Sequence, residues 1–162
     1  MPAVSNSSPL IILGAMGRIE ILRDVYGEVS VAPAVWRETV EDGAGRPGST
    51  ETERATWIHR RLPDPGNLSL AALAGLDAGE AESIALALSL PGERTIILDD
   101  RVARRVAQQL SLTLTGTAGV IVRAKTLGVV AAVRPLLVEA RSAGLHLNDA
   151  AFERFLQLAG EH

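Results

Sequence analysis

Two adjacent acidic residues, Asp99 and Asp100, directly follow an apolar run at positions 96–98. Such a run is typical of a strand in a sheet that is covered on both faces. Asp100 can be explained as the N-cap of a helix that begins at Arg101, because aspartate is among the best capping residues. That explanation does not reach Asp99, which would lie at the end of a buried strand. The pair therefore predicts a chemically active site at this strand end.

Oxygen-bearing side chains also follow the other predicted strands. In an open parallel sheet, the crevice beyond the carboxyl ends of the strands is the usual place for a ligand. We therefore expect the polar side chains near these strand ends to lie close together. Besides the two aspartates, the candidates are Asn6, Ser7, Ser8, Glu38, Glu80, Glu82, Thr115 and Thr117.

The candidate set consists of hard oxygen ligands, and the chain has no cysteine to supply a thiolate. Carboxylates that converge from separate strand ends repel one another, so a cation must neutralise them or some must hold a proton. Mg²⁺ and Mn²⁺ prefer carboxylate and carbonyl oxygens, with water completing the octahedron. One or two such ions can activate water for phosphodiester hydrolysis. The ensemble, rather than any single acid, therefore predicts a metal site.

Several of these acids also have a simpler explanation. Glu80 and Glu82 suit the first turn of a helix, where the helix dipole favours negative charge. Glu38, taken by itself, can be a solvated helix residue. These alternatives stay open at the level of the sequence.

Basic side chains gather on the predicted helix 101–110. Three arginines share one face with a glutamine, at spacings of three and four residues. Such a stripe could bind the phosphates of a single strand beside the acids. The alternative is a solvated face opposite the apolar positions Val102, Val106 and Leu110. The arginines are Arg101, Arg104 and Arg105.

Composition bounds the class of protein. The 162 residues suffice for one domain, and a hydrophobic fraction of 47% indicates a globular chain. A net charge of −3 gives no bulk attraction to nucleic acid. No signal peptide and no apolar run long enough to span a membrane is visible, so we expect a cytoplasmic protein that does not bind membranes. Lys125 is the only lysine, and the excess of arginine fits either phosphate recognition or genomic base composition.

Other familiar site patterns are missing from the sequence. His59, His146 and His162 do not have the spacing of a metal-binding pair on a helix. The glycines at 43–45 do not extend to a dinucleotide fingerprint, and no Walker lysine motif occurs. The histidines are therefore weak candidates.

The predicted elements alternate between strands and helices, which predicts an α/β fold: a three-layer α/β/α sandwich around a short parallel sheet. We expect one domain over 1–162, with helices from about 129 onward packing on it or at a dimer interface. Ser7 or Ser8 is expected to cap the first helix, with Pro9 at its first position. Strands are expected at 1–6, 28–33, 95–98 and 112–115. Helices are expected at 7–17, 18–27, 33–42, 76–90, 101–110, 116–128, 130–144 and 148–160. A helix running into an extended piece is expected at 51–62, and loops are expected at 43–50 and 63–67.

Five segments of the chain, taken in order, resemble a known family. They are VSNSSPLIILGAMG at 4–17, VAPAVWRETV at 31–40, LDAGEAESIALAL at 76–88, TIILDDRVARRVAQQLSL at 95–112 and TLTGTAGVIVRAKTLG at 113–128. Together they resemble the PIN-domain family, and most of all a PIN-like branch with an SPLI…GEAEAI…LDDR…GT pattern that is similar to VapC-type toxins. Each motif is weak alone, but their order and spacing cover nearly the whole chain.

The resemblance implies a parallel-sheet α/β/α fold, a Mg²⁺ or Mn²⁺ site and ribonuclease activity on single-stranded RNA. It also implies a homodimer and, for a toxin, a small antitoxin protein as partner. Carried over by position, the metal ligands are Asn6, Glu38, Glu82 or Glu80, and Asp99 or Asp100, with Glu38, Glu82, Asp99 and Asp100 as the catalytic acids. Ser7, Ser8 and the hydroxyl of Thr115 or Thr117 would support them.

Asn6 departs from the family pattern, which has an acid at this position. An amide oxygen can bind a hard cation but brings no charge, so metal affinity should be weaker. This departure motivates a second hypothesis, a catalytically weak or inactive PIN-like module that binds RNA or protein. A third hypothesis, a phosphoacceptor receiver domain, needs its acid pair after the first strand and a lysine after the last, and Lys125 lies within a predicted helix.

Overall fold

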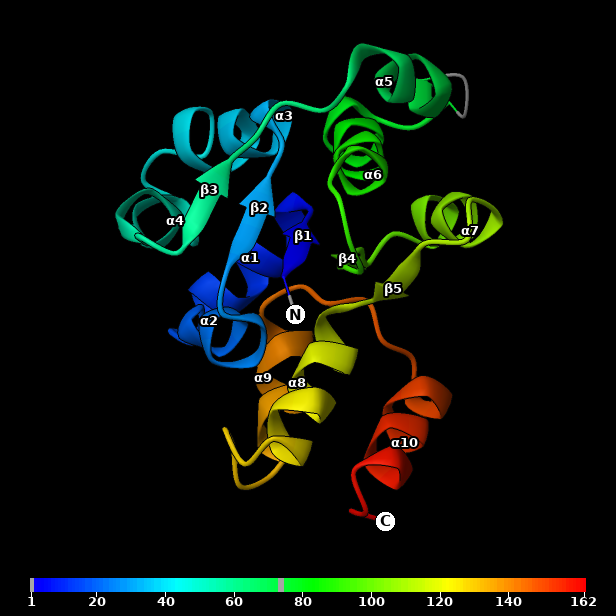
Figure 1. The fold of residues 1–162 in the computed structure, drawn as a ribbon. Coiled ribbons are helices and arrows are strands. Elements are labelled where there is room, and N and C mark those ends of the chain that lie inside the picture. Colours follow the sequence, from blue (N-terminus) through cyan, green and yellow to red (C-terminus); the bar gives the residue numbers. More distant parts are fainter. Residues whose placement is uncertain (1, 73–74) are drawn as a thin grey trace.

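The computed structural model describes residues 2–72 and 75–162, which form a parallel sheet with helices on both faces (Figure 1). Its five strands pair in the order β3-β2-β1-β4-β5, and every pairing is parallel. The predicted three-layer α/β fold is confirmed. The strands are β1 (Ala3–Ser5), β2 (Val29–Val31), β3 (Ile58–Arg60), β4 (Thr95–Ile97) and β5 (Thr113–Thr115).

The helices connect the strands and follow the last one. They are α1 (Ser7–Ala15), α2 (Glu20–Tyr26), α3 (Pro33–Trp36), the π-helical turn η1 (Arg37–Glu41), α4 (Ser49–Arg54), α5 (Pro65–Ala72), α6 (Ala78–Ser89), α7 (Arg101–Gln109), α8 (Thr117–Thr126), α9 (Arg134–Ser142) and α10 (Asp149–Leu158). None of these helices combines the length and the apolar character that crossing a bilayer requires.

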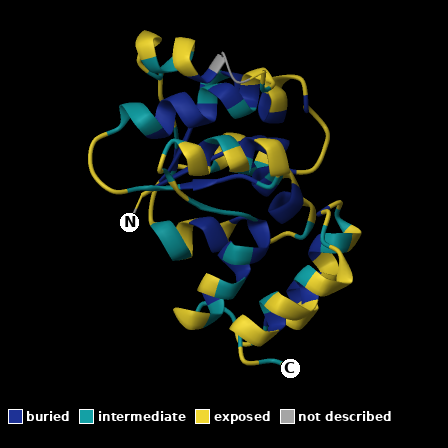
Figure 2. Ribbon diagram, turned by 90° about the vertical axis from the view of Figure 1, so that its right-hand side faces the viewer, coloured by how far each residue is buried: buried dark blue, intermediate teal, exposed yellow. Residues whose placement is uncertain are grey.

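The three central strands, β1, β2 and β4, are almost wholly buried because both faces of the sheet are covered. Successive side chains of a strand point to opposite faces, and the core divides accordingly. Ala3 and Ile97 belong to the cluster with α1, α2 and α8, whereas Val4 and Ile96 belong to the cluster with α6 and α7. Figure 2 shows the buried strands between helices whose outward faces are exposed. This double covering explains why 96–98 reads as a continuous apolar run.

The C-terminal helices pack on one face of the sheet. Leu137 of α9 and Leu156 of α10 are fully buried and belong to the same cluster as Ala3 and Val29. Figure 1 shows α8, α9 and α10 together on this side, opposite α5, α6 and α7. The contribution of α9 and α10 to a dimer interface stays a prediction.

Several local expectations need correction. Segment 58–60 is a fifth strand at the edge of the sheet, although the sequence predicted only an extended piece there. The predicted loop 63–67 is interrupted by α5, which begins at Pro65, because proline is well suited to a first helical position. Asn6 occupies the N-cap position of the first helix without a capping hydrogen bond from its side chain, so Ser7 is already helical and Pro9 is the third helical residue.

The buried face of α7 also differs from the prediction. Val102 is 53% exposed, and the fully buried residues of this helix are Ala103 and Ala107. These alanine side chains face the core where α7 packs against the edge strand β5. The prediction that Val102 marks the buried face was wrong, whereas Val106 and Leu110 pack partly buried against the core.

Candidate functional site

The strand order creates a switch point between β1 and β4. The chain leaves β1 toward β2 on one side and leaves β4 toward β5 on the other, so a crevice opens beyond the carboxyl ends of these two strands. The strand ends are joined by a hydrogen bond from the Asn6 amide to the Ile97 carbonyl, at 3.1 Å. The two segments that leave β1 and β4 therefore start next to each other, and they carry Asn6 and Asp99.

A cavity of about 340 Å³ lies at this switch point, and five carboxylates line it. They come from four segments of the chain: η1, the start of α6, the end of β4 and the start of α7. Asn6, Ser7, Ser8 and Ile11 line one side, and the loop between α9 and α10 closes another. The carboxylates are Glu38, Asp77, Glu80, Asp99 and Asp100.

Asp99 is the most firmly held of these acids. Its Oδ1 accepts a hydrogen bond from the Thr117 amide, and its Oδ2 accepts from the hydroxyls of Ser8 and Thr117, all at 2.7 Å. Gly116 leaves room for the carboxylate, since a Cβ there would lie 2.9 Å from Oδ1. Of the two candidate hydroxyls, Thr117 contacts Asp99, whereas the Thr115 hydroxyl lies against Gly119 of α8.

Glu38 is placed in the same cavity by the π-helical turn η1. The Ser7 hydroxyl donates to Glu38 Oε2 at 2.7 Å, which links the first turn of α1 to η1. Gly79, in the first turn of α6, accommodates this carboxylate, because a Cβ there would lie 2.8 Å from both oxygens. π-Helical turns inside helices are frequent at functional sites.

The structure distinguishes Glu80 from Glu82. Glu80 lines the cavity, whereas the Glu82 Oε1 accepts a hydrogen bond from the Ala34 amide at 3.0 Å, at the start of α3. Two residues along a helix are about 200° apart, so the two side chains leave α6 in different directions. Burial, followed by the hydrogen bond and charge of Asp77 and the charges of Asp100 and Glu38, raises the pKa of Glu80 to about 8.

Asp100 combines the two explanations that the sequence left open. Its Oδ2 accepts from the Ala103 amide at 2.9 Å, so Asp100 is the N-cap of α7. The same side chain lines the acidic cavity. Capping therefore uses one carboxylate oxygen, and the other has no hydrogen-bond partner among the described residues.

Asn6 provides the test of whether a cation fits here. The residue is 8% exposed, and its Oδ1 has no hydrogen-bond partner within residues 2–72 and 75–162. A buried oxygen without a donor costs about 1–3 kcal/mol, and a cation would satisfy it. In the part of the chain described here, no three acids or histidines converge tightly enough to enclose an ion. The donor set therefore fits a cation of the Mg²⁺ type, which binds through one or two carboxylates and keeps several waters.

The arginine stripe of α7 does not act as a unit. Arg101 and Arg105 are exposed, but Arg104 turns back and donates to the Leu98 carbonyl at 2.8 Å. Arg104 thereby lies beside Asp99, in a second, smaller cavity. Binding of RNA by this stripe stays a prediction.

Two cavity residues were missed in the sequence. Asp77 is the N-cap of α6 and accepts from the Glu80 amide at 2.8 Å, so the spacing Asp77–Glu80 is a capping signal that could have drawn attention to it. His146 lies in the loop between α9 and α10 and lines the cavity as well as the one beside Asp99. No local pattern marks His146, because a long-range contact brings that loop to the sheet.

Lys125 does not lie where the receiver-domain hypothesis needs a lysine. Lys125 donates to the Ala159 carbonyl and to Glu161, both at 2.8 Å, near the end of α8. The start of α8, at Thr117, is the end that contacts Asp99. The acidic pair also follows β4 rather than β1.

The chain matches a protein family described as a PIN domain, over residues 2–161. It belongs to the PIN-domain family. PIN domains are generally nucleases and typically use divalent metal ions, so this PIN domain has a nuclease-type fold, and oxygen-bearing side chains lie at the carboxyl edge of its sheet. No curated protein matches the chain.

Proposed function

We propose that this PIN domain is a metal-dependent endoribonuclease that hydrolyses phosphodiester bonds in single-stranded RNA. The observation that carries the proposal is the buried Oδ1 of Asn6, which has no hydrogen-bond partner among the residues that the structure describes and lies at a cavity lined by carboxylates. An oxygen in that setting needs a positively charged or hydrogen-donating partner, and anionic neighbours favour a cation. Mg²⁺ or Mn²⁺ would bind directly to one or two carboxylates and reach the others through water. The residues of this site are Asn6, Glu38, Glu80, Asp99 and Asp100.

The hydrogen bonds of the acids support this assignment. Ser7 anchors one oxygen of Glu38, and the Ala103 amide anchors one oxygen of Asp100. The other oxygen of each has no partner among the described residues and is free to face a ligand. Ser8 and Thr117 hold the Asp99 carboxylate in one orientation. Such hydrogen bonds orient the side chains that contact the metal and limit the entropy lost on metal binding.

The chemistry follows from this arrangement. When bound, the metal ion would supply a nucleophile from water at neutral pH and would neutralise charge on the phosphodiester. Glu80, whose pKa is about 8, holds a proton at neutral pH in the metal-free protein and must release it to act as a ligand. The acids of the cavity repel the phosphate until they are neutralised, so RNA binding at this point requires the cation.

The test is cleavage of single-stranded RNA by the wild type and by matched variants in the presence of Mn²⁺. Asp99→Asn and Glu80→Gln should lose cleavage by at least about a hundredfold, since each removes a ligand charge. Glu82→Gln keeps the oxygen that accepts from Ala34 and is the matched control on the same helix. Wild-type activity in Asp99→Asn would overturn the assignment of the site, and loss in Glu82→Gln but not in Glu80→Gln would reverse the choice between the two glutamates.

A second candidate function is favoured by the missing charge at Asn6. A weak or inactive module that binds RNA or protein would tolerate an amide where an acid serves catalysis. Asn6→Asp separates the two candidates: an increase from measurable wild-type activity supports the nuclease, whereas activity that appears only in the variant supports the binding module. For a toxin that acts as a homodimer beside a small antitoxin protein, growth arrest on expression and relief by the neighbouring gene product are the corresponding tests.

A further inference from the structure

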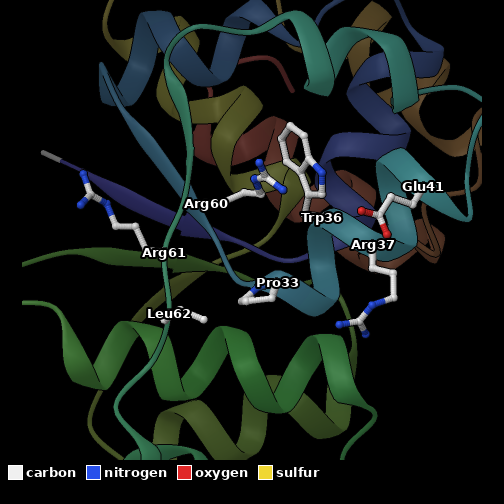
Figure 3. A pocket seen from close by; sticks show the side chains of 7 residues that line it. All are labelled: Pro33, Trp36, Arg37, Glu41, Arg60, Arg61 and Leu62. Atoms are coloured by element: carbon white, nitrogen blue, oxygen red, sulfur yellow. The ribbon is translucent and has the colours of Figure 1, made fainter.

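A further cavity, of about 300 Å³ and separate from the two cavities at Asp99, lies beyond the carboxyl ends of β2 and β3 (Figure 3). Pro33 follows β2, Arg60 ends β3, and Arg61 comes next. Trp36 and Arg37 reach the cavity from the junction of α3 and η1. Figure 3 shows the Arg60 side chain beside the Trp36 ring, with Arg37 and Arg61 extending on opposite sides of it. We call this the arginine pocket, defined by Trp36, Arg37, Arg60 and Arg61.

The arginine pocket adjoins the acidic cavity along the same edge of the sheet. β2 and β3 are the next strands after β1 in the sheet order. Neighbouring strands are about 5 Å apart, so a pocket that lies beyond both β2 and β3 is centred roughly 7 Å to the side of the end of β1. The chain itself links the two cavities, because Arg37 lines the pocket and the next residue, Glu38, lines the acidic cavity.

The pocket carries unbalanced positive charge. Three arginines and a single carboxylate, Glu41, line it. Within residues 2–72 and 75–162, no carboxylate lies within 4.0 Å of the three guanidinium groups, whereas Arg23 and Arg141 have acidic partners at 3.0 and 2.9 Å. The Nε of Arg61 donates to the neutral Ser30 hydroxyl, at 3.1 Å, rather than to a carboxylate. An anion is therefore the ligand that this surface fits.

Flat and apolar surfaces accompany the charges. The Arg60 guanidinium lies 4.5 Å from the centre of the Trp36 ring, which orients the planar group without using its N–H donors. Pro33 and Leu62 also line the pocket, and Leu62 is 81% exposed. Guanidinium forks suit phosphate, while aromatic rings and guanidinium planes stack on bases. The combination fits a nucleotide better than an acidic peptide, which offers no planar group to stack.

We propose that the arginine pocket binds a nucleotide of single-stranded RNA beside the bond to be cleaved. The inference rests on the proposed function for the adjoining cavity, which it deepens by assigning the path of the strand. The base stacks on the Arg60–Trp36 pair, and the phosphates on its two sides contact Arg37 and Arg61, which extend on opposite sides of that pair. The strand then passes along the sheet edge, from β3 and β2 toward β1, where the acids lie.

The first experiment measures binding of a fluorescent single-stranded oligoribonucleotide in EDTA at low salt, where no metal-dependent cleavage occurs. Arg37→Ala and Arg60→Ala should each weaken binding about tenfold. The slope of log affinity against log salt should become shallower by about 0.7 for each phosphate contact removed. Arg23→Ala is the matched control, because it removes the same charge from α2, near the amino end of β2. Equal binding by wild type and both pocket variants, or no binding by the wild type, would overturn the proposal.

A direct readout uses the tryptophan. The chain has two tryptophans, so Trp57→Phe leaves Trp36 as the sole indole fluorophore. Its fluorescence should be quenched on titration with the oligoribonucleotide and unchanged on titration with a polyglutamate peptide. A response to the peptide alone would show that the pocket is a protein-docking surface and would overturn the proposal. Arg37→Lys keeps the charge and checks that any loss in Arg37→Ala is not a folding defect.

Cleavage kinetics separate this inference from the proposed function. If both hold, the pocket variants raise KM for RNA in Mn²⁺ and leave kcat unchanged at saturation. If the wild type cleaves RNA but the pocket variants match it in KM and binding, the pocket assignment alone fails. If the wild type binds RNA without cleaving it, and the pocket variants bind RNA more weakly than the wild type, the nuclease proposal alone fails.

Discussion

Replacement of Glu80 by glutamine should remove a pH dependence from the stability of the protein. Burial and the neighbouring acids raise the pKa of Glu80 from the ordinary value of 4.5 to about 8 in the folded state. Between these values the folded protein holds a proton that the unfolded chain has lost. The free energy of unfolding of the wild type therefore falls as the pH rises through this interval and levels off above pH 8. A glutamine has no such proton to lose.

The magnitude follows from the pKa difference. A change from 4.5 to about 8 corresponds to about 5 kcal/mol if the whole effect appears in stability. Glu80 is only half-buried, and solvent screening weakens the charge repulsion that contributes to the shift. We therefore expect Glu80→Gln to be more stable than the wild type by about 1–2 kcal/mol above pH 8 and equal to it below pH 4.5.

Denaturant unfolding between pH 4.5 and 9 measures this difference. The same series with Mn²⁺ should invert the order at pH 8, because the metal stabilises the wild type and has fewer ligands in Glu80→Gln. Glu82→Gln, which changes the same charge on the same helix, should follow the wild type in both series. Parallel pH profiles of wild type and Glu80→Gln would refute the reasoning, since they would mean that neither burial nor the neighbouring acids raise the pKa of Glu80 in the folded protein.

Three further predictions address the cavity and the fold. Gly79→Ala should keep or raise stability, by up to about 1 kcal/mol, because alanine has the higher helix propensity. The same variant should be stabilised less by Mn²⁺, because its Cβ displaces the Glu38 carboxylate. A wild-type response to Mn²⁺ would contradict the contact at 2.8 Å. Leu137→Ala should cost about 2–5 kcal/mol in a single unfolding transition, whereas a separate early transition would show that α9 is not part of one core. Hydrogen bonds from Lys125 and from the amides of Val133 and Arg134 lower the pKa of Glu161 to about 2. Glu161→Gln should therefore be less stable than the wild type above pH 4.5, and the difference in stability should disappear as the pH falls to 2. A difference that stays constant in acid unfolding curves would argue against this.

Local patterns determined most of the fold. The β-branched and apolar runs at 28–33 and 95–98 predicted two strands, because residues buried on both faces need apolar side chains throughout. The capping signal at Asp100 placed the start of α7, since this cap involves a contact only three residues away. Segment 58–60 was the exception: its strand has only one buried residue, Ile58, and forms because β2 offers an unpaired edge.

The sequence by itself determined which residue types follow the strands, and therefore that an oxygen-rich site lies at the carboxyl edge of the sheet. The choice among its members belonged to the tertiary structure. Glu80 and Glu82 have equal claims in sequence, and only the packing of α6 against the start of α3 directs Glu82 to the Ala34 amide. His146 and the arginine pocket carry no local signal at all, because segments distant in sequence meet there. Periodicity and capping are short-range effects, whereas the contents of a cavity depend on how distant segments pack.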